Sequence, residues 1–355
     1  MQPASLRKAG DLANVFGAYE DRPNLSNVAG GPSKHSAKVE LQIVLEMPLF
    51  SVVIPSFNRV ALLDATLKSV FAQRFTEYEI IVVDDGSTDA TMDYLQSLQQ
   101  RVAIFHQPNR GPGAARNRGA RHAGGAYLAF LDSDDLWFPW TLEVYRDVIQ
   151  KYNDPSFVTG RPYLFSNDDE WKTLNQSTMA ESEGFVDSLA SGGWRWWSAS
   201  SFVIRRDVFA AAGGFTDEWV IGEDVDLTLR LGVAHGFVHI TAPVTFAYRN
   251  HAGSLKHDLT RMYASAQLMI RAEHKGNYPG GGARERARRE ILTRHTRAVT
   301  LLCLGQGLLD KAWTLYRTTF TWNASLGRLK YLAGFPLLVV AAWTRSLLRV
   351  NPRSA

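Results

Sequence analysis

Cysteine is almost absent from this sequence of 355 residues, with Cys303 as its single example. One cysteine cannot form an internal disulfide framework. The sequence also shows no N-terminal apolar segment followed by a small-residue cleavage site, which a secretory signal needs. From these two absences we expect the main folded part of the protein to be cytoplasmic.

Two common nucleotide-binding patterns are missing as well. Because the sequence contains neither GxGxxG nor GxxxxGK[ST], a Rossmann dinucleotide site and a P-loop are both disfavoured. A strong excess of one charge is also missing, since 39 Lys and Arg residues stand against 35 Asp and Glu residues. We expect no nucleic acid among the partners.

The residues that are present indicate an ordinary globular protein, with 45% hydrophobic and 21% charged residues. They fall into three zones. Residues 1–47 are rich in Ser, Gly, Pro and Asn without a sustained period, which predicts a mobile arm. Residues 48–254 alternate between strand-like and helical patterns, and residues 255–355 are helical in pattern.

The middle zone has the pattern of an α/β fold. Strands are predicted at residues 50–56, 78–84, 102–107 and 126–132. Helical patterns lie near residues 60–73, 88–100 and 113–123. Continuously apolar strands are typical of parallel sheets buried on both faces. We therefore expect a Rossmann-like, mainly parallel sheet flanked by helices, with a C-terminal helical extension.

Polar clusters follow three of the predicted strands, with the sequences SFNR, DDGSTD and DSDD. Ligands collect at the carboxyl ends of parallel strands, so we expect these clusters to converge on one rim. In the last cluster, Asp132 and Asp134 suit a hard divalent cation such as Mg²⁺ or Mn²⁺. A simple Asx turn is the alternative, but it accounts for Asp135 alone and leaves the other two carboxylates uncompensated.

Two further segments suit a nucleoside diphosphate. Turn and cap chemistry explains most of DDGSTD but not Asp85, which could accept from a base or a ribose hydroxyl. The glycine-rich segment NRGPGAARNRG opens a helix, and its backbone and guanidinium groups suit phosphate. Arg116 is the candidate there, because the later arginines are explained by a solvated helix face.

Acids and tryptophans mark a fourth region. Glu223 and Asp224 fall at the start of a predicted helix, where the helix dipole explains an acid but where a carboxylate could also accept a proton. Trp194 and Trp196 occupy a glycine-flanked loop. They fit either buried packing or stacking against sugar rings.

Taken in order, the segments SVVIPSFNR, EIIVVDDGSTD, NRGPGAARNRG, YLAFLDSDD, GGF and GEDVDLTLR resemble the family 2 glycosyltransferases, which have a GT-A fold. The resemblance covers about residues 48–254. It implies an inverting transfer of a sugar from a nucleoside-diphosphate sugar to an acceptor hydroxyl. The setting would be the assembly of a cell-surface glycan or glycolipid.

The resemblance also implies roles for particular residues. Those expected to hold the nucleotide sugar are Pro55, Phe57, Asn58, Asp85, Arg116, Asp132 and Ser133. The metal ligands it implies are Asp132, Asp134 and His251, although a loop histidine without a role explains the last one equally well. Asp224 is the implied catalytic base. Acceptor contacts are expected from Glu223, Trp194 and Trp196.

The C-terminal zone is basic. Between residues 301 and 355, seven Lys and Arg residues accompany one acid, Asp310. The apolar stretch at 331–344 is too short to span a bilayer comfortably and contains Pro336. It fits a helix lying at an anionic membrane surface on the cytoplasmic side, or a helix packed on the catalytic domain.

Three other functions remain open at this point. The acceptor could be a polyisoprenyl phosphate rather than a glycan. A sugar nucleotidyltransferase also combines a nucleotide-binding sheet with metal-binding acids, but it has no use for the GED helix. An inactive sugar-binding module would be expected to lose the acids that this sequence keeps.

Overall fold

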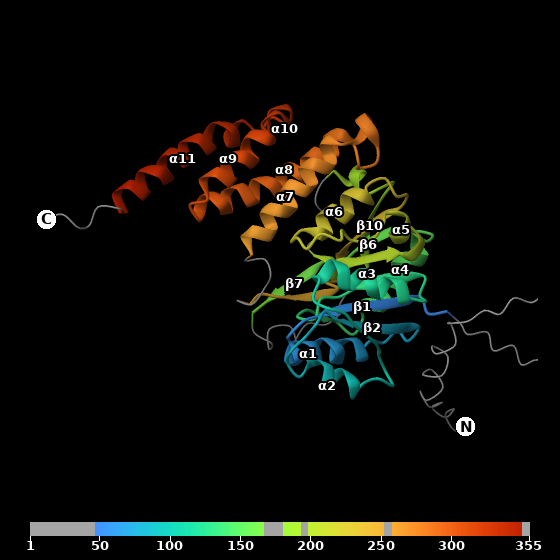
Figure 1. The fold of residues 1–355 in the computed structure, drawn as a ribbon. Coiled ribbons are helices and arrows are strands. Elements are labelled where there is room, and N and C mark those ends of the chain that lie inside the picture. The colour runs from blue at the N-terminus through green and yellow to red at the C-terminus, as the bar shows by residue number, and fades with distance from the viewer. Residues whose placement is uncertain (1–46, 167–179, 193–197, 252–257, 350–355) are drawn as a thin grey trace, which may run out of the picture.

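The computed structural model describes residues 47–166, 180–192, 198–251 and 258–349 (Figure 1). The predicted N-terminal arm lies almost wholly outside these residues, as do Trp194 and Trp196.

The described residues form one central sheet of eight strands in the order β3-β2-β1-β4-β9-β6-β10-β8. The strands are β1 (Phe50–Ser56), β2 (Tyr78–Asp84), β3 (Ala103–His106), β4 (Tyr127–Phe130), β6 (Phe157–Thr159), β8 (Glu181–Phe185), β9 (Phe202–Arg205) and β10 (Phe237–Ala242). β1 runs parallel to β2 and β4, and β2 runs parallel to β3. β9 is antiparallel to both of its neighbours. The predicted α/β fold with a mainly parallel sheet is confirmed.

Helices cover both faces of this sheet because successive strand residues point to opposite sides. Val52 and Ile54 of β1 pack in one hydrophobic cluster with α1 (Val60–Phe71), α2 (Thr91–Gln96) and α4 (Thr141–Lys151). Val53, between them, belongs to the opposite cluster, which includes α3 (Pro112–His122), α5 (Arg206–Ala211) and α6 (Glu223–Arg230). Gly119 lets α3 approach closely, since a Cβ there would lie 2.5 Å from Val53 Cγ1.

Two predicted elements are shorter than their sequence patterns. The helix predicted near 88–100 is limited to Thr91–Gln96. The amides of Thr88 and Asp89 donate instead to Asn58 Oδ1, which holds the preceding loop against the end of β1. The strand predicted at 126–132 ends at Phe130. The amide of Asp132 donates to Ser200 Oγ at 3.0 Å, so it does not join a neighbouring strand.

A small second sheet supports the segment that follows β4. It has the order β5-β11-β7, with β5 (Leu136–Trp137), β7 (Pro162–Phe165) and β11 (Phe246–Arg249). β11 pairs antiparallel with β5 and parallel with β7. This pairing brings Arg249 and His251, at the end of β11, next to the DSDD segment.

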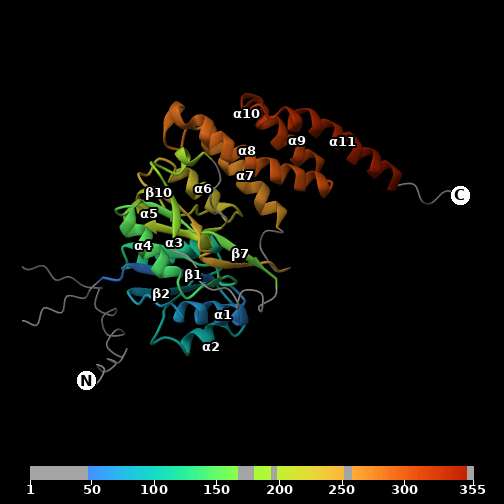
Figure 2. The ribbon, with the colours of Figure 1, turned by 180° about the vertical axis from the view of Figure 1, so that it is seen from behind.

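The C-terminal helices form a further layer beyond α6, as both views show (Figures 1 and 2). They are α7 (Leu259–His274), α8 (Gly281–Gly305), α9 (Leu309–Thr318), α10 (Phe320–Ser325) and α11 (Leu329–Arg349). Met269 of α7 and Leu292 of α8 share a hydrophobic cluster with Leu227 of α6. The predicted helical extension is thus confirmed. Across the described residues, no helix combines the length and apolar character that crossing a membrane requires.

Candidate functional site

A cavity of about 320 Å³ opens at the carboxyl ends of β1, β2 and β4. That volume is in the usual range for a small-ligand site. Nine of the predicted site residues line it: Pro55, Phe57, Asp85, Arg116, Asp132, Ser133, Asp134, Glu223 and Asp224. The prediction that separate polar clusters converge on one rim is therefore confirmed.

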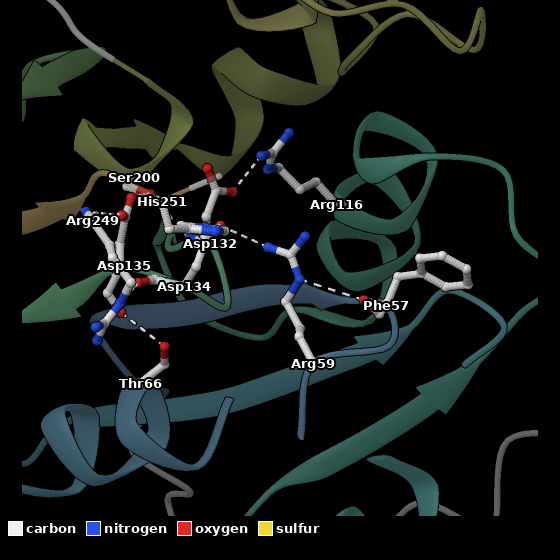
Figure 3. Close-up of polar contacts among 10 residues, drawn as sticks. All are labelled: Phe57, Arg59, Thr66, Arg116, Asp132, Asp134, Asp135, Ser200, Arg249 and His251. Carbon is white, nitrogen blue, oxygen red and sulfur yellow. Dashed lines mark hydrogen bonds and ion pairs between the residues drawn. The ribbon is translucent and has the colours of Figure 1, made fainter. Parts of the chain in front are cut away.

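Three aspartates that line this cavity lie close together (Figure 3). Asp132, Asp134 and Asp135 each offer a carboxylate oxygen, and these oxygens lie within 4.8 Å of one another. Oxygen ligands at this spacing suit Mg²⁺ or Mn²⁺. The donor set therefore fits the divalent cation that the sequence predicts.

The interpretation that Asp132 and Asp134 stand uncompensated is wrong. Asp134 Oδ2 accepts from Arg59 Nη1 at 2.7 Å and lies 3.0 Å from His251 Nε2. Asp132 pairs with Arg116 (Figure 3). Arg59 directly precedes α1, Arg116 lies in α3 and His251 follows β11, and the two arginines supply countercharge to the carboxylates. The sequence pattern could not show these partners because they are far apart along the chain.

Asp135 does more than form a turn. Its side chain is only 1% exposed; Oδ2 accepts from Ser200 Oγ at 2.6 Å and Oδ1 accepts from the amide of Arg249 at 3.0 Å. Burial, together with the neighbouring Asp134 and Asp132 charges, raises the pKa of Asp135 well above its usual value. Asp135 therefore joins the second sheet to the rim of the cavity.

Two predicted nucleotide-binding residues also hold loops in place. Asp85 is buried, and its carboxylate accepts from Gln107 Nε2 and from the amides of Arg110 and Gly111. The expectation that Asp85 has nothing to cap is wrong, because it fixes the loop that leads into α3. Asn58 ties the loops after β1 and β2 together, and it does not line the cavity.

Arg116 pairs with two carboxylates that line the cavity. Its buried guanidinium bonds to Asp132 and, through Nη1, to Glu223 Oε1 at 2.7 Å. The two carboxylates raise the pKa of Arg116 above its usual value despite its burial. Glu223 also accepts from the amide of Gly222 at 3.1 Å. Both carboxylate oxygens of Glu223 therefore accept hydrogen bonds from the protein.

Asp224 lies beside Glu223 and differs from it. Its Oδ1 accepts from the amide of Val225 at 2.8 Å, and the side chain lines the cavity. Burial, and next the negative charge of Glu223, raises the pKa of Asp224 to about 7. A carboxylate with such a pKa can take up a proton near neutral pH.

Among the cavity-lining residues that sequence reasoning missed are Arg59 and Trp219. Arg59 directly follows the SFN segment at the end of β1, so its place on the predicted rim was a usable signal. Trp219 is 38% exposed in a loop before α6, and no local pattern distinguishes it from a packing residue.

Comparisons with known proteins identify the domain. The model of the family described as glycosyl transferase family 2 matches residues 51–210. An uncharacterized glycosyltransferase of Rickettsia conorii is 39% identical over 151 residues, covering 42% of this chain and 22% of that protein. The GalNAc(5)-diNAcBac-PP-undecaprenol β-1,3-glucosyltransferase of Campylobacter jejuni is 37% identical over 126 residues, covering 34% of this chain and 38% of that protein. The chain spans between 20% and 51% of the length of the first curated relatives.

A solved structure extends the likeness beyond the matched residues. The crystal structure of S. aureus TarS 1-349 in complex with UDP-GlcNAc superposes with a TM-score of 0.60 at 19% identity, over 80% of this chain and 83% of that chain. At this identity the likeness concerns the fold alone. Residues 51–210 therefore match glycosyl transferase family 2, and the chain has a GT-A fold.

Proposed function

We propose that this chain is a metal-dependent, inverting glycosyltransferase that moves a sugar from a nucleoside-diphosphate sugar to an acceptor hydroxyl. One observation carries the proposal. Asp224, with a pKa raised to about 7, lines the same cavity as the three clustered aspartates. A proton acceptor and a site for diphosphate charge are the two requirements of this reaction.

The donor would lie along the carboxyl ends of β1, β2 and β4. Pro55, Phe57 and Asp85 line that part of the cavity and suit the base and ribose. Arg59 and Arg116 would stabilise the negative charge that develops on the leaving diphosphate. Both guanidiniums pair with aspartates of the cluster. A diphosphate bound to a cation at this cluster would therefore lie close to them.

A divalent cation, Mn²⁺ or Mg²⁺, fits the aspartate cluster. Asp132 and Asp134 would hold it, with His251 close to Asp134. When bound, it would neutralise the diphosphate leaving group. Asp135 is a weaker candidate, because both of its carboxylate oxygens already accept hydrogen bonds from the protein.

Asp224 would act as the base. It would take the proton of the acceptor hydroxyl, whose oxygen attacks the anomeric carbon from the face opposite the diphosphate, with inversion. Glu223 would keep Arg116 in place through their ion pair. It would also border the acceptor. Residues 48–254 would then form the catalytic domain.

The acceptor is proposed from the relatives. The name of the Campylobacter jejuni relative describes transfer to a glycan linked to undecaprenol diphosphate. We infer a growing cell-surface glycan or glycolipid as the acceptor here, with direct transfer to a polyisoprenyl phosphate as the main competitor. A nucleotidyltransferase would leave Asp224 without a role, and an inactive module would not need it.

Product analysis tests this function. UDP, GDP and dTDP are first screened for thermal stabilisation of the protein with and without Mn²⁺. Sugar derivatives of the nucleotide that stabilises most are then incubated with acceptors, and products are identified by mass spectrometry. Glycosylated product with an inverted anomeric centre is expected. Formation of nucleoside triphosphate and sugar 1-phosphate from the sugar nucleotide and added pyrophosphate would indicate a nucleotidyltransferase, and binding without turnover would indicate an inactive module.

We also propose that the C-terminal helices contact an anionic membrane surface. One side of α11 packs inward through Tyr331, Phe335 and Val339. The exposed apolar side chains Leu329, Leu337 and Val340 recur at helical spacing along another side. Basic residues flank this stretch in the sequence, which suits an amphipathic helix at a membrane interface.

Liposome flotation checks this contact. Replacing both Leu337 and Val340 with Glu adds negative charge to the exposed side of α11, where 71% of Leu337 and 58% of Val340 is exposed. We expect the full-length protein to float with vesicles that contain anionic lipid, and the double variant to remain at the bottom. Val186→Glu is a matched control, since Val186 is 55% exposed on another part of the molecule. Equal flotation of all three proteins would exclude α11 as the membrane contact.

A further inference from the structure

The loop that precedes Asp224 is held by helices outside the family match. The amide of Ile221 donates to the carbonyl of Arg261 in α7 at 3.5 Å. Gly222, with φ of +109°, packs against Ser265 of α7 and His295 of α8; a Cβ on it would lie 2.8 Å from Ser265 Oγ and 3.0 Å from His295 Cε1. The C-terminal helices therefore set the position of residues 219–222.

Trp219 is the aromatic residue of this loop that lines the cavity. The guanidinium of Arg261 lies over its indole, with Cζ 3.9 Å from the ring centroid. Asp258 in turn holds the Arg261 guanidinium at 2.7 Å. An exposed cation over an aromatic ring contributes modest stabilisation, enough to favour one orientation of the ring. The indole is thus fixed in place and still 38% exposed.

His295 also lines the cavity. Burial lowers the pKa of His295 to about 4, so the ring is neutral near pH 7. A neutral imidazole and an exposed indole give the cavity some surface with little charge. The aspartates and arginines that also line it are charged. Sugars are uncharged and have apolar C–H faces that suit aromatic surfaces, whereas diphosphate suits the charged side chains.

We propose that Trp219 contacts the acceptor sugar and that Arg261 is its positioning residue, so that the C-terminal helices build the acceptor subsite. The inference rests on the proposed function, because Asp224 must lie next to the acceptor hydroxyl. Trp219 precedes Asp224 by five positions in a loop that lines one cavity with it. This assignment gives Trp219 the role that the sequence suggested for Trp194 and Trp196.

A double-mutant cycle tests the proposal. The proteins are wild type, Trp219→Ala, Arg261→Met and the double variant, and the acceptors are the methyl β-glycosides of glucose, galactose, GlcNAc and GalNAc. Trp219→Ala is expected to raise the acceptor KM about tenfold. Arg261→Met is expected to raise it about threefold in the wild-type background and not at all in Trp219→Ala, because its effect acts through the indole.

Two conservative variants and two further readouts complete the design. Trp219→Phe and Arg261→Lys should restore most of the acceptor KM. Affinity for the nucleoside diphosphate should be unchanged in every variant, as should the melting temperature to within a few degrees.

Each other result has one meaning. Unchanged acceptor KM in Trp219→Ala, or a KM increase matched by loss of nucleotide affinity, overturns the assignment. An additive effect of the two substitutions overturns the positioning role of Arg261. Donor hydrolysis by wild type without transfer to any glycoside rejects a sugar subsite here and leaves the proposed chemistry standing. No turnover of any sugar nucleotide by wild type refutes the proposed function itself.

Discussion

Replacement of Asp224 by Asn is expected to lower glycosyl transfer by about 10²–10⁴-fold while donor affinity changes little. An amide has almost the same shape as a carboxylate but cannot accept the proton of the attacking hydroxyl. Transfer rate and nucleotide affinity are measured separately, by product formation and by titration calorimetry. Loss of rate without loss of affinity is the signature of a missing base.

The structure favours Asp224 over Glu223 for this role. Glu223 is bound by the Arg116 guanidinium and by the amide of Gly222, which occupy both of its oxygens. Among the described residues, only the amide of Val225 donates a hydrogen bond to the Asp224 carboxylate. Asp224 therefore has an oxygen available for an acceptor hydroxyl.

The pH profile gives Asp224 a second readout. Burial raises the pKa of Asp224 from 3.8 to about 7, so at lower pH the residue is protonated and cannot act as a base. In wild type kcat/KM should therefore rise with pH and level off above this pKa. A metal ion at the aspartate cluster would add positive charge and lower the pKa of Asp224. The acid limb, which is the rise of kcat/KM with pH, should therefore have its midpoint between pH 3.8 and about 7. Asp224→Asn should lack this limb.

Asp217→Asn is the matched control, because it makes the same chemical change on an exposed residue of the preceding loop that does not line the cavity. It should keep both the rate and the acid limb. Near-wild-type turnover in Asp224→Asn would assign the base to another residue. A large loss of nucleotide affinity would instead make Asp224 a binding residue.

Replacement of Asp134 by Asn is expected to abolish the effect of Mn²⁺ on nucleotide binding. Partners that only touch a metal ligand contribute about 10–100-fold to metal affinity, so loss of a ligand itself should cost at least about 100-fold. Calorimetry of nucleoside diphosphate binding with and without Mn²⁺ measures the difference. Wild type should bind more tightly with the metal, and the variant should bind equally in both conditions.

The contacts of Asp134 add a prediction about binding without metal. Arg59 and His251 both lie next to Asp134 Oδ2. In Asp134→Asn these groups lose their carboxylate partner, so Arg59 becomes available to the diphosphate. Metal-free binding by the variant should therefore equal or exceed that of wild type. A variant that merely misfolds would lose this binding as well.

Asp147→Asn serves as the control for this change, because Asp147 is exposed and pairs with Arg146 away from the cavity. It should keep the full response to Mn²⁺. If Asp134→Asn also keeps that response at wild-type strength, the aspartate cluster is not the metal site, and Arg59 and Arg116 balance its charges instead.

Local patterns predicted the central strands and the polar rim well. β1 and β2 have the predicted bounds, because an uninterrupted apolar run is buried on both faces wherever it lies in such a sheet. The clusters at their carboxyl ends converge because parallel strands end on the same side. These features depend on neighbours along the chain, so the sequence alone contains them.

The sequence by itself thus determined the α/β fold, the rim and the acids on it, and the order of its motifs pointed to the family. The tertiary structure decided which groups those acids meet. Arg59 lies 75 residues from Asp134, Arg116 lies 107 residues from Glu223, and His251 lies 117 residues from Asp134. The contacts of α7 and α8 with the loop before Asp224 also join residues that are far apart in the sequence. Such contacts arise from the packing of whole elements, which no short pattern records, and they decide whether a carboxylate is paired, buried or free to react.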